Sequence, residues 1–441
     1  MQVNTRALDK SQLKLNYRSS AITIGFAIAF MLVLLRPQTV DGQTFKVIHY
    51  FSFGDGAYPY AGVTVGGTGV LYGTTQGGGV NGCTIGCGVA YELKQVGSQW
   101  NLIPLYDFKG GNDGANPTST LTVASDSTLY GVTSDLYSGV AGTVFRLTPR
   151  PTLCKTAFCY LNKQVIYSFS GGNDGALPYE QTLMIDPATG NVYGTTQLGG
   201  GYGQGVAFKL SKSGNGWVES QSYSFAGEPN DAASPLSGLI SDSVGNLYGA
   251  SMAGGVTGYE GCSNGCGTIY KITTSGQTWS DTILQALHPG SGQGQQPSGT
   301  LVMDSHGNIY GTSWGAIFEL VYSNGSYTFQ TLDNSCSQTY AGLTLDSATG
   351  DLYGVCFYGG TDNAGFVYKL TYSNSKWQLT HLHDFSSADG TSPTGPVAID
   401  ASGNLFGTAY YGGMPNQNCS NGGCGTVWEI TGAAAPIKER N

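Results

Sequence analysis

Four aspartates that are each followed by glycine recur along the chain: Asp55, Asp113, Asp174 and Asp389. Carboxylates are hard oxygen donors, so a ring of them could bind Ca²⁺ or the hydroxyl groups of a ligand. The same pair also builds a tight turn, because glycine accepts the positive φ that such turns require. The sequence contains no D-x-D-x-D-G series, which would mark a calcium loop. We predict no cofactor, and the turn role stays open beside a Ca²⁺ or ligand role for these aspartates.

The ten cysteines form five pairs that are close in the sequence. An even number of cysteines in an exported chain predicts disulfides. A disulfide needs Cα atoms about 4.4–6.8 Å apart, whereas four residues of strand span about 13 Å, so the short pairs must lie in curled loops. Zinc is the alternative, but a structural site needs four ligands and these pairs lie far apart along the chain. The predicted disulfides, which would stiffen loops, are Cys83–Cys87, Cys154–Cys159, Cys262–Cys266, Cys336–Cys356 and Cys419–Cys424.

Several tyrosines fall in loop-like stretches and could stack on a sugar ring, because aromatic faces offer large rigid contact area. They are Tyr58, Tyr137, Tyr202, Tyr259, Tyr358, Tyr410 and Tyr411. With the four Asp-Gly aspartates, we name Tyr58, Tyr202, Tyr259 and Tyr410 as candidate ligand-binding residues.

Signatures of catalysis are weak, and we predict no catalytic residues. Residues 311–315 (GTSWG) match the letters of a G-x-S-x-G elbow, but that elbow needs a following helix and this stretch has the pattern of a strand. His381 and His383 share one strand face without a third metal ligand nearby, so a surface or packing role is the simpler interpretation. No H-E-x-x-H, P-loop or dinucleotide fingerprint is present. Paired carboxylates for glycoside chemistry could come from the aspartate loops, but a single sequence does not single them out.

Residues 1–42 differ in character from the rest. Four basic residues between Arg6 and Arg18 precede an apolar run at 21–35, which is short for a membrane span of about 20 residues and typical of a secretory signal. Val40 and Gly42 suit cleavage before Gln43, and an uncleaved anchor is the alternative. Either way we expect an exported protein, whether secreted, periplasmic or at the cell surface.

The remaining chain has 14 basic and 26 acidic residues, a formal charge of −12. Such a surface repels phosphate backbones, so we do not expect nucleic acid as a partner. We expect a monomer whose partner is a glycan or a protein at the cell surface, with membrane contact only through an uncleaved N-terminus.

A Leu-Tyr-Gly-Thr-like tetrad appears seven times, at intervals of 43 to 63 residues. Its aromatic residues are Tyr72, Tyr130, Tyr193, Tyr248, Tyr310, Tyr353 and Phe406. Repeats of this length indicate an array of supersecondary units that bury their apolar faces against one another. Each copy contains short strand-like runs separated by Gly, Asn, Asp and Pro, as in Trp100–Phe108 and Leu129–Thr133. The repeated aromatics favour packing between sheets.

Four strands in each of seven copies predict an all-β seven-bladed propeller. The segment Phe45–Phe53 resembles the outermost strand of a blade, and Gly425–Thr431 resembles a third strand. We therefore predict that the N-terminal strand completes the last blade and closes the ring. The predicted domains are a signal peptide at 1–42, the propeller at 43–432 and a short tail at 433–441.

Propeller topology predicts which loops share a face. The Asp-Gly loops join the outer strand of one blade to the inner strand of the next, and the long Gly/Cys loops join second to third strands. Both kinds should lie on one rim, around the mouth of the channel. Three copies depart from the Asp-Gly pattern, at Asp231-Ala232, Gln293–Pro297 and Asn334–Tyr340, which indicates either one specialised side of the rim or sequence drift.

The copies resemble the bacterial tandem repeat of the Gloeobacter–Verrucomicrobia (GloVer) family. The third copy carries the pattern nearly complete, in Phe169–Pro178 (FSGGNDGALP), Gly190–Gly200 (GNVYGTTQLGG) and Gly205–Leu210 (GVAFKL). The resemblance covers about residues 45–431 and implies an exported repeat protein without an assigned activity.

These observations favour a non-enzymatic propeller that binds a ligand through the rim of Asp-Gly and Cys loops. A carbohydrate-active enzyme, a glycosidase or lyase with rim carboxylates, is one alternative. A structural module of the cell envelope without a small-molecule site is the other.

Overall fold

The computed structural model describes residues 42–434, except 81, 136–140, 149–161, 180–181, 260, 277 and 421. The predicted signal segment up to residue 41, Tyr137 and the Cys154–Cys159 pair lie outside the described residues. Contacts divide the chain between Gln43 and Thr44, and Thr44–Asn441 forms one compact unit. Among the described residues, no helix combines the length and the apolar character that a membrane span requires.

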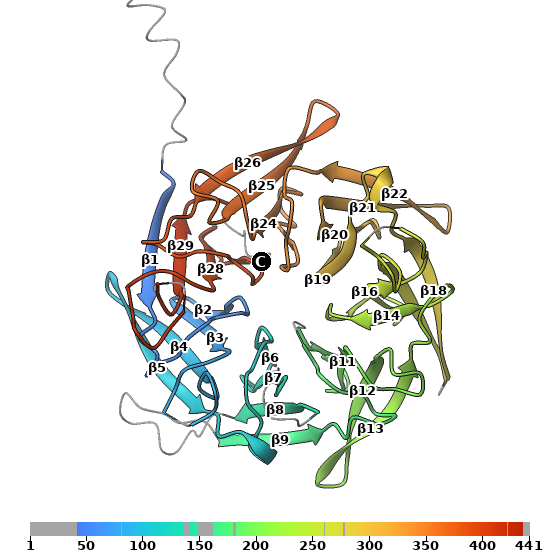
Figure 1. The fold of residues 1–441 in the computed structure, drawn as a ribbon, viewed down its shortest axis with the longest axis horizontal. Coiled ribbons are helices and arrows are strands. Elements are labelled where there is room, and N and C mark those ends of the chain that lie inside the picture. Colours follow the sequence, from blue (N-terminus) through green and yellow to red (C-terminus); the bar gives the residue numbers. More distant parts are fainter. Residues whose placement is uncertain are drawn as a thin grey trace, which may run out of the picture. The chain divides into compact units, whose positions relative to one another are not determined.

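This unit is a ring of seven antiparallel sheets, so the predicted seven-bladed propeller is confirmed (Figure 1). Blade 1 consists of β2 (Thr64–Gly67), β3 (Val70–Thr75), β4 (Val89–Val96) and β5 (Gln99–Asp107). Blade 2 consists of β6 (Thr122–Val123), β7 (Leu129–Thr133), β8 (Thr143–Thr148) and β9 (Asn162–Ser168). Blade 3 consists of β10 (Met184–Ile185), β11 (Val192–Thr196), β12 (Val206–Ser213) and β13 (Gly216–Ser224).

Blade 4 has a divided inner strand, in which both β14 (Ala232–Pro235) and β15 (Ile240–Ser241) pair with β16 (Leu247–Gly254). Its outer part is β17 (Thr268–Ser275) and β18 (Thr278–Ala286). Blade 5 consists of β19 (Gln295–Met303), β20 (Ile309–Trp314), β21 (Ala316–Ser323) and β22 (Ser326–Asp333). Blade 6 consists of β23 (Thr344–Leu345), β24 (Leu352–Cys356), β25 (Phe366–Ser373) and β26 (Lys376–Asp384). The helical content of the described residues is two 3₁₀ turns, η1 (Gly111–Asp113) and η2 (Pro289–Ser291).

Blade 7 joins the two ends of the propeller. Its strands are β27 (Ala398–Ile399), β28 (Leu405–Ala409), β29 (Thr426–Thr431) and, on the outside, β1 (Thr44–Tyr50). β1 pairs with β29 in antiparallel register, from Thr44 opposite Thr431 to Tyr50 opposite Thr426. The predicted closure by the N-terminal strand is therefore confirmed, and it leaves no unpaired sheet edge between blades 7 and 1.

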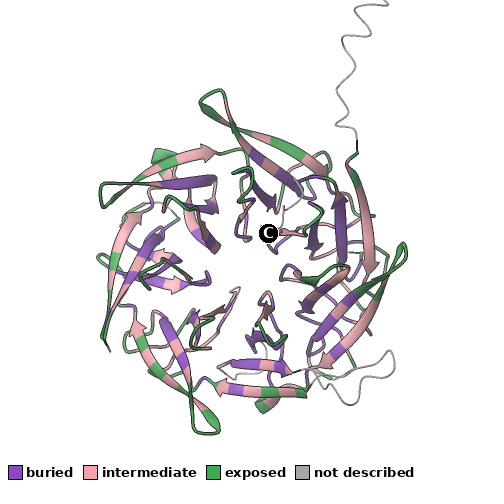
Figure 2. Ribbon diagram, turned by 180° about the vertical axis from the view of Figure 1, so that it is seen from behind, coloured by how far each residue is buried: buried purple, intermediate pink, exposed green. Residues whose placement is uncertain are grey.

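Packing explains why the tetrad contains a glycine. On the third strand an aromatic ring lies across this glycine, as Tyr368 does across Gly354 in blade 6. A Cβ on Gly354 would lie 2.4 Å from the Tyr368 hydroxyl oxygen, and the tetrad glycines of five other blades have equally close aromatic neighbours. The ring replaces the missing side chain, so the second and third strands become almost fully buried, whereas outer strands alternate between half-buried and exposed residues (Figure 2).

The tetrad aromatic, in turn, packs between blades. In four interfaces it meets a tryptophan from the start of the next outer strand, with ring centroids 5.7 to 6.4 Å apart. The pairs are Phe406–Trp100, Tyr130–Trp217, Tyr193–Trp279 and Tyr310–Trp377. The predicted packing role of the repeated aromatics is confirmed in these interfaces.

The two faces of the ring differ in their connections. We call the face that carries the outer-to-inner and second-to-third strand loops the upper face, and the opposite one the lower face. On the lower face the turn between first and second strands is closed by its own aspartate: Asp304 accepts hydrogen bonds from the backbone of His306 (2.8 Å) and Asn308 (2.9 Å). Asp242 and Asp400 make the same contacts in their blades. These turns need no partner from a neighbouring blade.

Candidate functional site

The four Asp-Gly loops lie on the upper face, and each carboxylate accepts hydrogen bonds from its own loop. The backbone donors are Ser52 for Asp55 (2.8 Å), Lys109 for Asp113 (2.9 Å), Ser170 for Asp174 (2.8 Å) and Ser386 for Asp389 (2.7 Å). The outer strand that precedes each loop adds a side chain: His49 (3.2 Å), Tyr106 (2.8 Å), Tyr167 (3.2 Å) and His383 (3.0 Å), in the same order. Each carboxylate thus already accepts from at least two donors. The structure of the loop alone is enough to explain why aspartate recurs at this position.

The glycine of the pair is equally constrained. Gly175 has φ +97°, and a Cβ there would lie 2.2 Å from the Thr196 hydroxyl oxygen on β11 of the next blade. Gly56 and Gly114 meet threonines of their next blades in the same way, at 2.7 and 2.4 Å. The Asp-Gly pair therefore docks one blade on the next, because only glycine allows this backbone to approach the following sheet.

Of the two histidines predicted to have surface or packing roles, His383 lies in one of these interfaces and His381 packs within its own blade. The ring of His383 stacks on Phe45 of β1, with centroids 3.4 Å apart. Burial acts to raise the pKa of Asp389, but hydrogen bonds from His383 and Ser386 outweigh it and hold that pKa below its usual value. His381 stacks on Phe366 and contacts Asp384 at 2.7 Å. Ser313 of the G-x-S-x-G match is a buried strand residue bonded to the Gln293 carbonyl (3.0 Å), without the helix that the elbow needs.

The neighbour of each Asp-Gly carboxylate differs from blade to blade. Lys163, on β9 of blade 2, extends its ammonium to Asp113 at 2.9 Å, and its side chain is only 2% exposed. Burial lowers the pKa of Lys163, and the contact with Asp113 opposes that shift. In the next interface Glu219 takes the place of the lysine, and the Tyr167 hydroxyl lies between its carboxylate (3.3 Å) and that of Asp174 (3.2 Å).

A second carboxyl pair lies one interface further on, between blades 3 and 4. The Tyr223 hydroxyl is 3.1 Å from an oxygen of Asp231 and 2.7 Å from an oxygen of Asp281 on β18. Burial, together with a side-chain hydrogen bond to Asp231, raises the pKa of Asp281 to about 6. One member of this pair is therefore an acid that can hold a proton near neutral pH. Asp281 lies on the outer strand β18, whereas Asp231 lies in the loop just before the inner strand β14 and meets Tyr223 of the outer strand β13.

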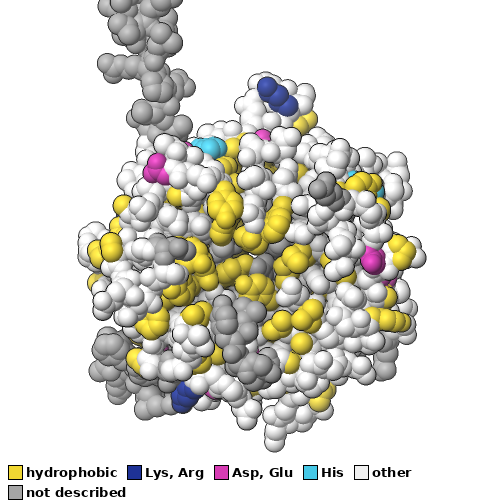
Figure 3. All heavy atoms as spheres, in the orientation of Figure 1, with side chains coloured by type: hydrophobic (Ala, Val, Ile, Leu, Met, Phe, Trp, Pro, Cys, Tyr) yellow, Lys and Arg dark blue, Asp and Glu magenta, His cyan; other side chains and the backbone are white. Residues whose placement is uncertain are grey.

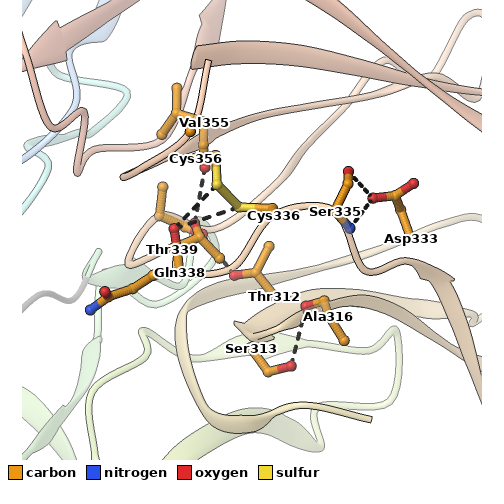
Figure 4. Close-up of a disulfide and its surroundings, with 12 residues drawn as sticks. Thr312, Ser313, Ala316, Asp333, Ser335, Cys336, Gln338, Thr339, Val355 and Cys356 are labelled. Carbon is orange, nitrogen blue, oxygen red and sulfur yellow. Dashed lines mark hydrogen bonds between the residues drawn. A yellow bond between two sulfur atoms is a disulfide. The ribbon is translucent and has the colours of Figure 1, made fainter. Parts of the chain in front are cut away.

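In two of the copies that depart from the Asp-Gly pattern, a different side chain accepts the backbone N–H of the loop. Asp231 accepts the backbone N–H of Ala226 at 2.6 Å, and in blade 5 the amide oxygen of Gln293 accepts that of His288 at 3.2 Å. In blade 6 a disulfide ties the loop down: Cys336 is bonded to Cys356 at the end of β24 (Figure 4). The sulfurs of this disulfide lie 3.4 and 3.5 Å from the Gln338 carbonyl oxygen.

Four of the five predicted disulfides are present in the described residues, and the fifth, Cys154–Cys159, lies outside them. Their Cα–Cα distances are 5.0 Å for Cys83–Cys87, 4.9 Å for Cys262–Cys266, 5.6 Å for Cys336–Cys356 and 5.2 Å for Cys419–Cys424. All four involve upper-face loops, as predicted. Among the described residues, no group of three or more His, Cys, Asp or Glu side chains is arranged to hold a metal ion.

The predicted tyrosines have different environments. Tyr58 is buried, and its hydroxyl oxygen accepts the backbone N–H of Ser420 at 2.8 Å, which anchors the Cys419–Cys424 loop. Tyr202 and Tyr259 are 67% and 40% exposed, on the long loops of blades 3 and 4. Tyr410 is half-buried near the axis and donates its hydroxyl proton to the Gln76 side chain. The structure therefore brings Tyr58 and Tyr410 together, with ring centroids 5.5 Å apart, and does not bring Tyr202 or Tyr259 to them.

Two clusters of aromatic rings instead surround the upper mouth of the channel. The first contains Tyr60, Tyr179 and Tyr410, in which Tyr60 is 5.4 Å from Tyr179 and 5.5 Å from Tyr410 between ring centroids. Tyr411 and Tyr58 extend it. Tyr60 also lines the cavity on the axis, which is only about 20 Å³ in volume. The axis is thus narrow at this level, and a larger cavity of about 290 Å³ adjoins it, sharing Thr120, Thr182 and Thr300 with the small one.

The second cluster belongs to blades 5 and 6. Its rings are Trp314, Tyr340, Phe357 and Tyr358, linked by centroid distances of 4.6 to 5.9 Å. Tyr340 lines the same axial cavity as Tyr60. Figure 3 shows the hydrophobic side chains gathered around the centre of the ring, with charged side chains at its edge. We call the two clusters together the aromatic mouth.

Sequence reasoning named four rings of the aromatic mouth, Tyr58, Tyr358, Tyr410 and Tyr411, but missed the other five, although a signal was present. Aligned at the same position of the outer-to-inner loop, the copies carry Tyr60, Thr118, Tyr179, Leu236, Ser298, Tyr340 and Thr394. Only three of these seven residues are aromatic, so the position does not stand out as a repeat. The signal is that this side chain varies from copy to copy although the backbone around it repeats.

Comparisons with known proteins agree with the fold. The model of the Gloeobacter/Verrucomicrobia repeat matches residues 37–259 and 152–316. Among curated proteins none matches this sequence. Virginiamycin B lyase from Staphylococcus aureus is 16% identical, with a TM-score of 0.53 over 88% of this chain and 99% of that chain. A catalytically inactive variant of that lyase with quinupristin is 15% identical, with a TM-score of 0.54 over the same shares.

The extracellular domain of the one-component system BT4673 from B. thetaiotaomicron is also similar. It is 12% identical, with a TM-score of 0.50 over 90% of this chain and 43% of that chain. Identities this low establish a common propeller architecture and no shared activity. The family match is of a different kind, because it rests on the repeated sequence and spans more than half of the chain. The chain therefore belongs to the Gloeobacter/Verrucomicrobia repeat family.

Proposed function

We propose that this protein is an exported, non-enzymatic propeller that binds a glycan on its aromatic mouth. The observation that carries the proposal is that rings from several blades meet around one point of the upper face, where Tyr60 and Tyr340 line the same axial cavity. Flat rings contact the C–H face of a pyranose and leave its hydroxyl groups free to hydrogen-bond. The glycan would rest on the mouth, because the small cavity that Tyr60 and Tyr340 line does not admit a sugar ring.

The polar surroundings of the mouth suit a neutral sugar. Gln76 and Thr118 beside the aromatic residues are almost fully buried, so the hydroxyl groups of the half-buried tyrosines are the ones that can exchange hydrogen bonds with a sugar. The excess of acidic residues in the chain disfavours phosphate backbones and other polyanions. A neutral glycan, or a protein presenting one, at a cell surface fits both properties.

Export is part of the proposal and rests on two separate features. The N-terminal basic and apolar run has the pattern of a secretory signal. The four disulfides of the described residues favour an oxidising compartment, because such bonds rarely persist in a reducing cytosol.

The test is retention of the purified protein on a panel of immobilised neutral polysaccharides and peptidoglycan. The variant Tyr60→Ala/Tyr340→Ala should lose about tenfold or more in affinity, since each stacked ring contributes about 1 kcal/mol. The matched control is Tyr202→Ala/Tyr372→Ala, which removes two exposed tyrosines that lie away from the axis. Equal losses in the two variants would contradict the aromatic mouth as the site. Retention on nothing would point to a protein partner or to a structural role in the envelope.

A carbohydrate-active enzyme is the second candidate, and the Asp231/Asp281 pair is the observation that favours it. A carboxyl group with a pKa near 6 beside a second carboxylate is the arrangement that general acid catalysis requires. Neither carboxyl group belongs to the aromatic mouth, so the binding proposal is stronger. Release of sugar from a retained polysaccharide, abolished in Asp281→Asn, would decide for the enzyme.

A further inference from the structure

The lower side of the ring contains a slot at each blade interface, where the tetrad aromatic meets the next blade. Tryptophan fills it in four interfaces, through Trp100, Trp217, Trp279 and Trp377. Between blades 6 and 7 the C-terminal segment takes this place, since the Tyr353 hydroxyl donates to the Ala433 carbonyl at 3.1 Å and Tyr353 is fully buried. Filling this slot is thus a general feature of the fold.

The slot between blades 4 and 5 is different. The residue that corresponds to tryptophan is Tyr327, at the start of β22, and its ring lies 6.4 Å from that of Tyr248. A cavity of about 630 Å³ adjoins this pair of rings. Met303 and Tyr322 form further parts of its wall, and Tyr322 is 44% exposed. We call this cavity the blade 4/5 groove.

One cation lines the groove without a partner. Lys271 on β17 lies over the Tyr248 ring at 5.7 Å, and within the described ranges it has no hydrogen bond or ion pair. Its counterparts are engaged: Lys209 donates to Gln221 at 3.1 Å, and Lys369 contacts Asp351 at 2.7 Å. The difference has a simple cause, because the residue opposite Lys271 on β18 is Thr282, which is shorter than the Gln221 opposite Lys209.

The carboxylate in the groove does not neutralise this lysine. Both oxygens of Asp242 are occupied within its own turn, by the backbone N–H and the side-chain amide of Asn246 (2.9 and 2.7 Å) and by the Tyr248 hydroxyl (3.0 Å). Asp242 keeps its negative charge, but it forms no ion pair with Lys271 within the described residues, so the lysine is the charged side chain of the groove that is left to pair with a ligand. Beside it lie two tyrosine rings, Tyr322 and Tyr327, 5.1 Å apart and inclined at 49°.

We propose that the blade 4/5 groove is a second binding site, which takes a single sugar ring that carries a carboxylate. The ammonium of Lys271 pairs with the carboxylate, because it is the unpartnered cation of the groove. The rings of Tyr322 and Tyr327 contact the apolar face of the sugar. Thr273 lies on the same strand as Lys271, and Thr282 lies on the neighbouring strand β18. Their hydroxyl groups can hydrogen-bond to the oxygen atoms of the sugar. The site lies on the lower side of the ring and does not rest on the function proposed for the aromatic mouth.

The experiment is calorimetric titration of the full protein with D-glucuronate and D-galacturonate, and with D-glucose as the neutral comparison. We expect a Kd of about 1 mM for at least one hexuronate, a value suited to a small ligand with a single charged contact. Glucose should bind at least about tenfold more weakly, because a hydrogen bond to a charged group is worth one power of ten or more.

Two variants and a control test the residues. Tyr322→Ala removes an exposed ring from the wall of the groove, so it should weaken hexuronate binding about tenfold while the melting temperature changes little. Lys271→Gln should weaken binding about tenfold. Lys209→Gln, the matched change in the filled slot between blades 3 and 4, should leave binding unchanged.

Four results would overturn the proposal. They are no hexuronate binding at concentrations about ten times the expected Kd, equal affinity for glucuronate and glucose, unchanged binding in Tyr322→Ala, and equal losses in Lys271→Gln and Lys209→Gln. Because the aromatic mouth is intact in all of these variants, retention on neutral polysaccharide separates failure of this site from failure of the mouth.

Discussion

The interior of the blades and the loops of the upper face use the same repeat differently. In the interior, a tetrad glycine meets a third-strand aromatic ring in blade after blade, with nearly the same geometry. On the upper face, the Asp-Gly carboxylate also recurs, but it meets Lys163 in one interface and Glu219 in the next. A repeated residue therefore has a repeated role only when its neighbours are repeated too.

The largest expected effect concerns the repeated interior. In Gly354→Ala the new Cβ would lie 2.4 Å from the oxygen of the fully buried Tyr368 side chain. We expect a loss of at least about 3 kcal/mol in the free energy of unfolding, because a packed core resists an added methyl group. Denaturant unfolding measures it. Gly216→Ala is the control, since its nearest neighbour is 3.8 Å away, and equal midpoints for the two variants would refute the packing argument.

The next prediction compares two disulfides of the upper loops. Replacing Cys336 and Cys356 by serine opens a loop with a sequence separation of 20, whereas Cys83 and Cys87 are separated by only 4. Loop entropy then predicts losses of about 3 kcal/mol and about 2 kcal/mol. Thermal unfolding of both double variants tests the order, and added reductant should bring the wild type to the lower of the two values or below it. A larger loss from the short loop would show that local packing, not chain entropy, dominates.

Much of the fold could be predicted from sequence, because the signals that determine it are local. The tetrad, the strand alternation and the turn residues repeat within each copy, so counting them gave seven blades. The likeness of Phe45–Phe53 to other outer strands predicted the closure of the ring. The cysteine pairs were visible for the same reason, as four of the disulfides connect residues within one copy.

The environments of the side chains were not predictable in this way, because they depend on pairs of residues from different blades. Asp113 and Lys163 are 50 residues apart, and only the register of β9 brings them together. The aromatic mouth joins Tyr60 to Tyr179 and to Tyr410, from three distant loops. The blade 4/5 groove joins Lys271 of blade 4 to Tyr322 of blade 5, two residues that are distant in the sequence.

The Asp-Gly loops provide the third prediction. Asp113→Asn removes the counter-charge of Lys163, whose side chain is almost completely buried, and should cost about 2 kcal/mol of unfolding free energy. Asp174→Asn should change stability by less than about 0.5 kcal/mol, because that carboxylate faces Glu219 rather than a cation. In the Asp113→Asn background, Lys163→Met should recover part of the loss. Similar losses in Asp113→Asn and Asp174→Asn would mean that the hydrogen bonds of the turn, which both loops share, determine the loss, and that the charge of the neighbouring side chain does not.

The smallest expected effect concerns the carboxyl pair between blades 3 and 4. The pKa of Asp281 is raised to about 6 in the folded protein, from an ordinary value of 3.8. Between these two values the folded state binds more protons than the unfolded chain, so this group reduces stability as the pH rises. Asp281→Asn should therefore stabilise the protein at pH 7.5, by about 1 kcal/mol once partial solvent exposure is allowed for.

The difference between this variant and the wild type should shrink as the pH falls from about 6 to about 4, which unfolding midpoints measured at several pH values would reveal. Asp186→Asn is the opposite control, because the Thr189 hydroxyl and the Ala188 backbone hold the pKa of Asp186 below its usual value. Its removal should destabilise the protein at neutral pH. A constant difference for Asp281→Asn across this range would show that the pair does not share a proton. In that case Asp281 would not act as an acid near neutral pH, and the proposal of a carbohydrate-active enzyme would lose the observation that favours it.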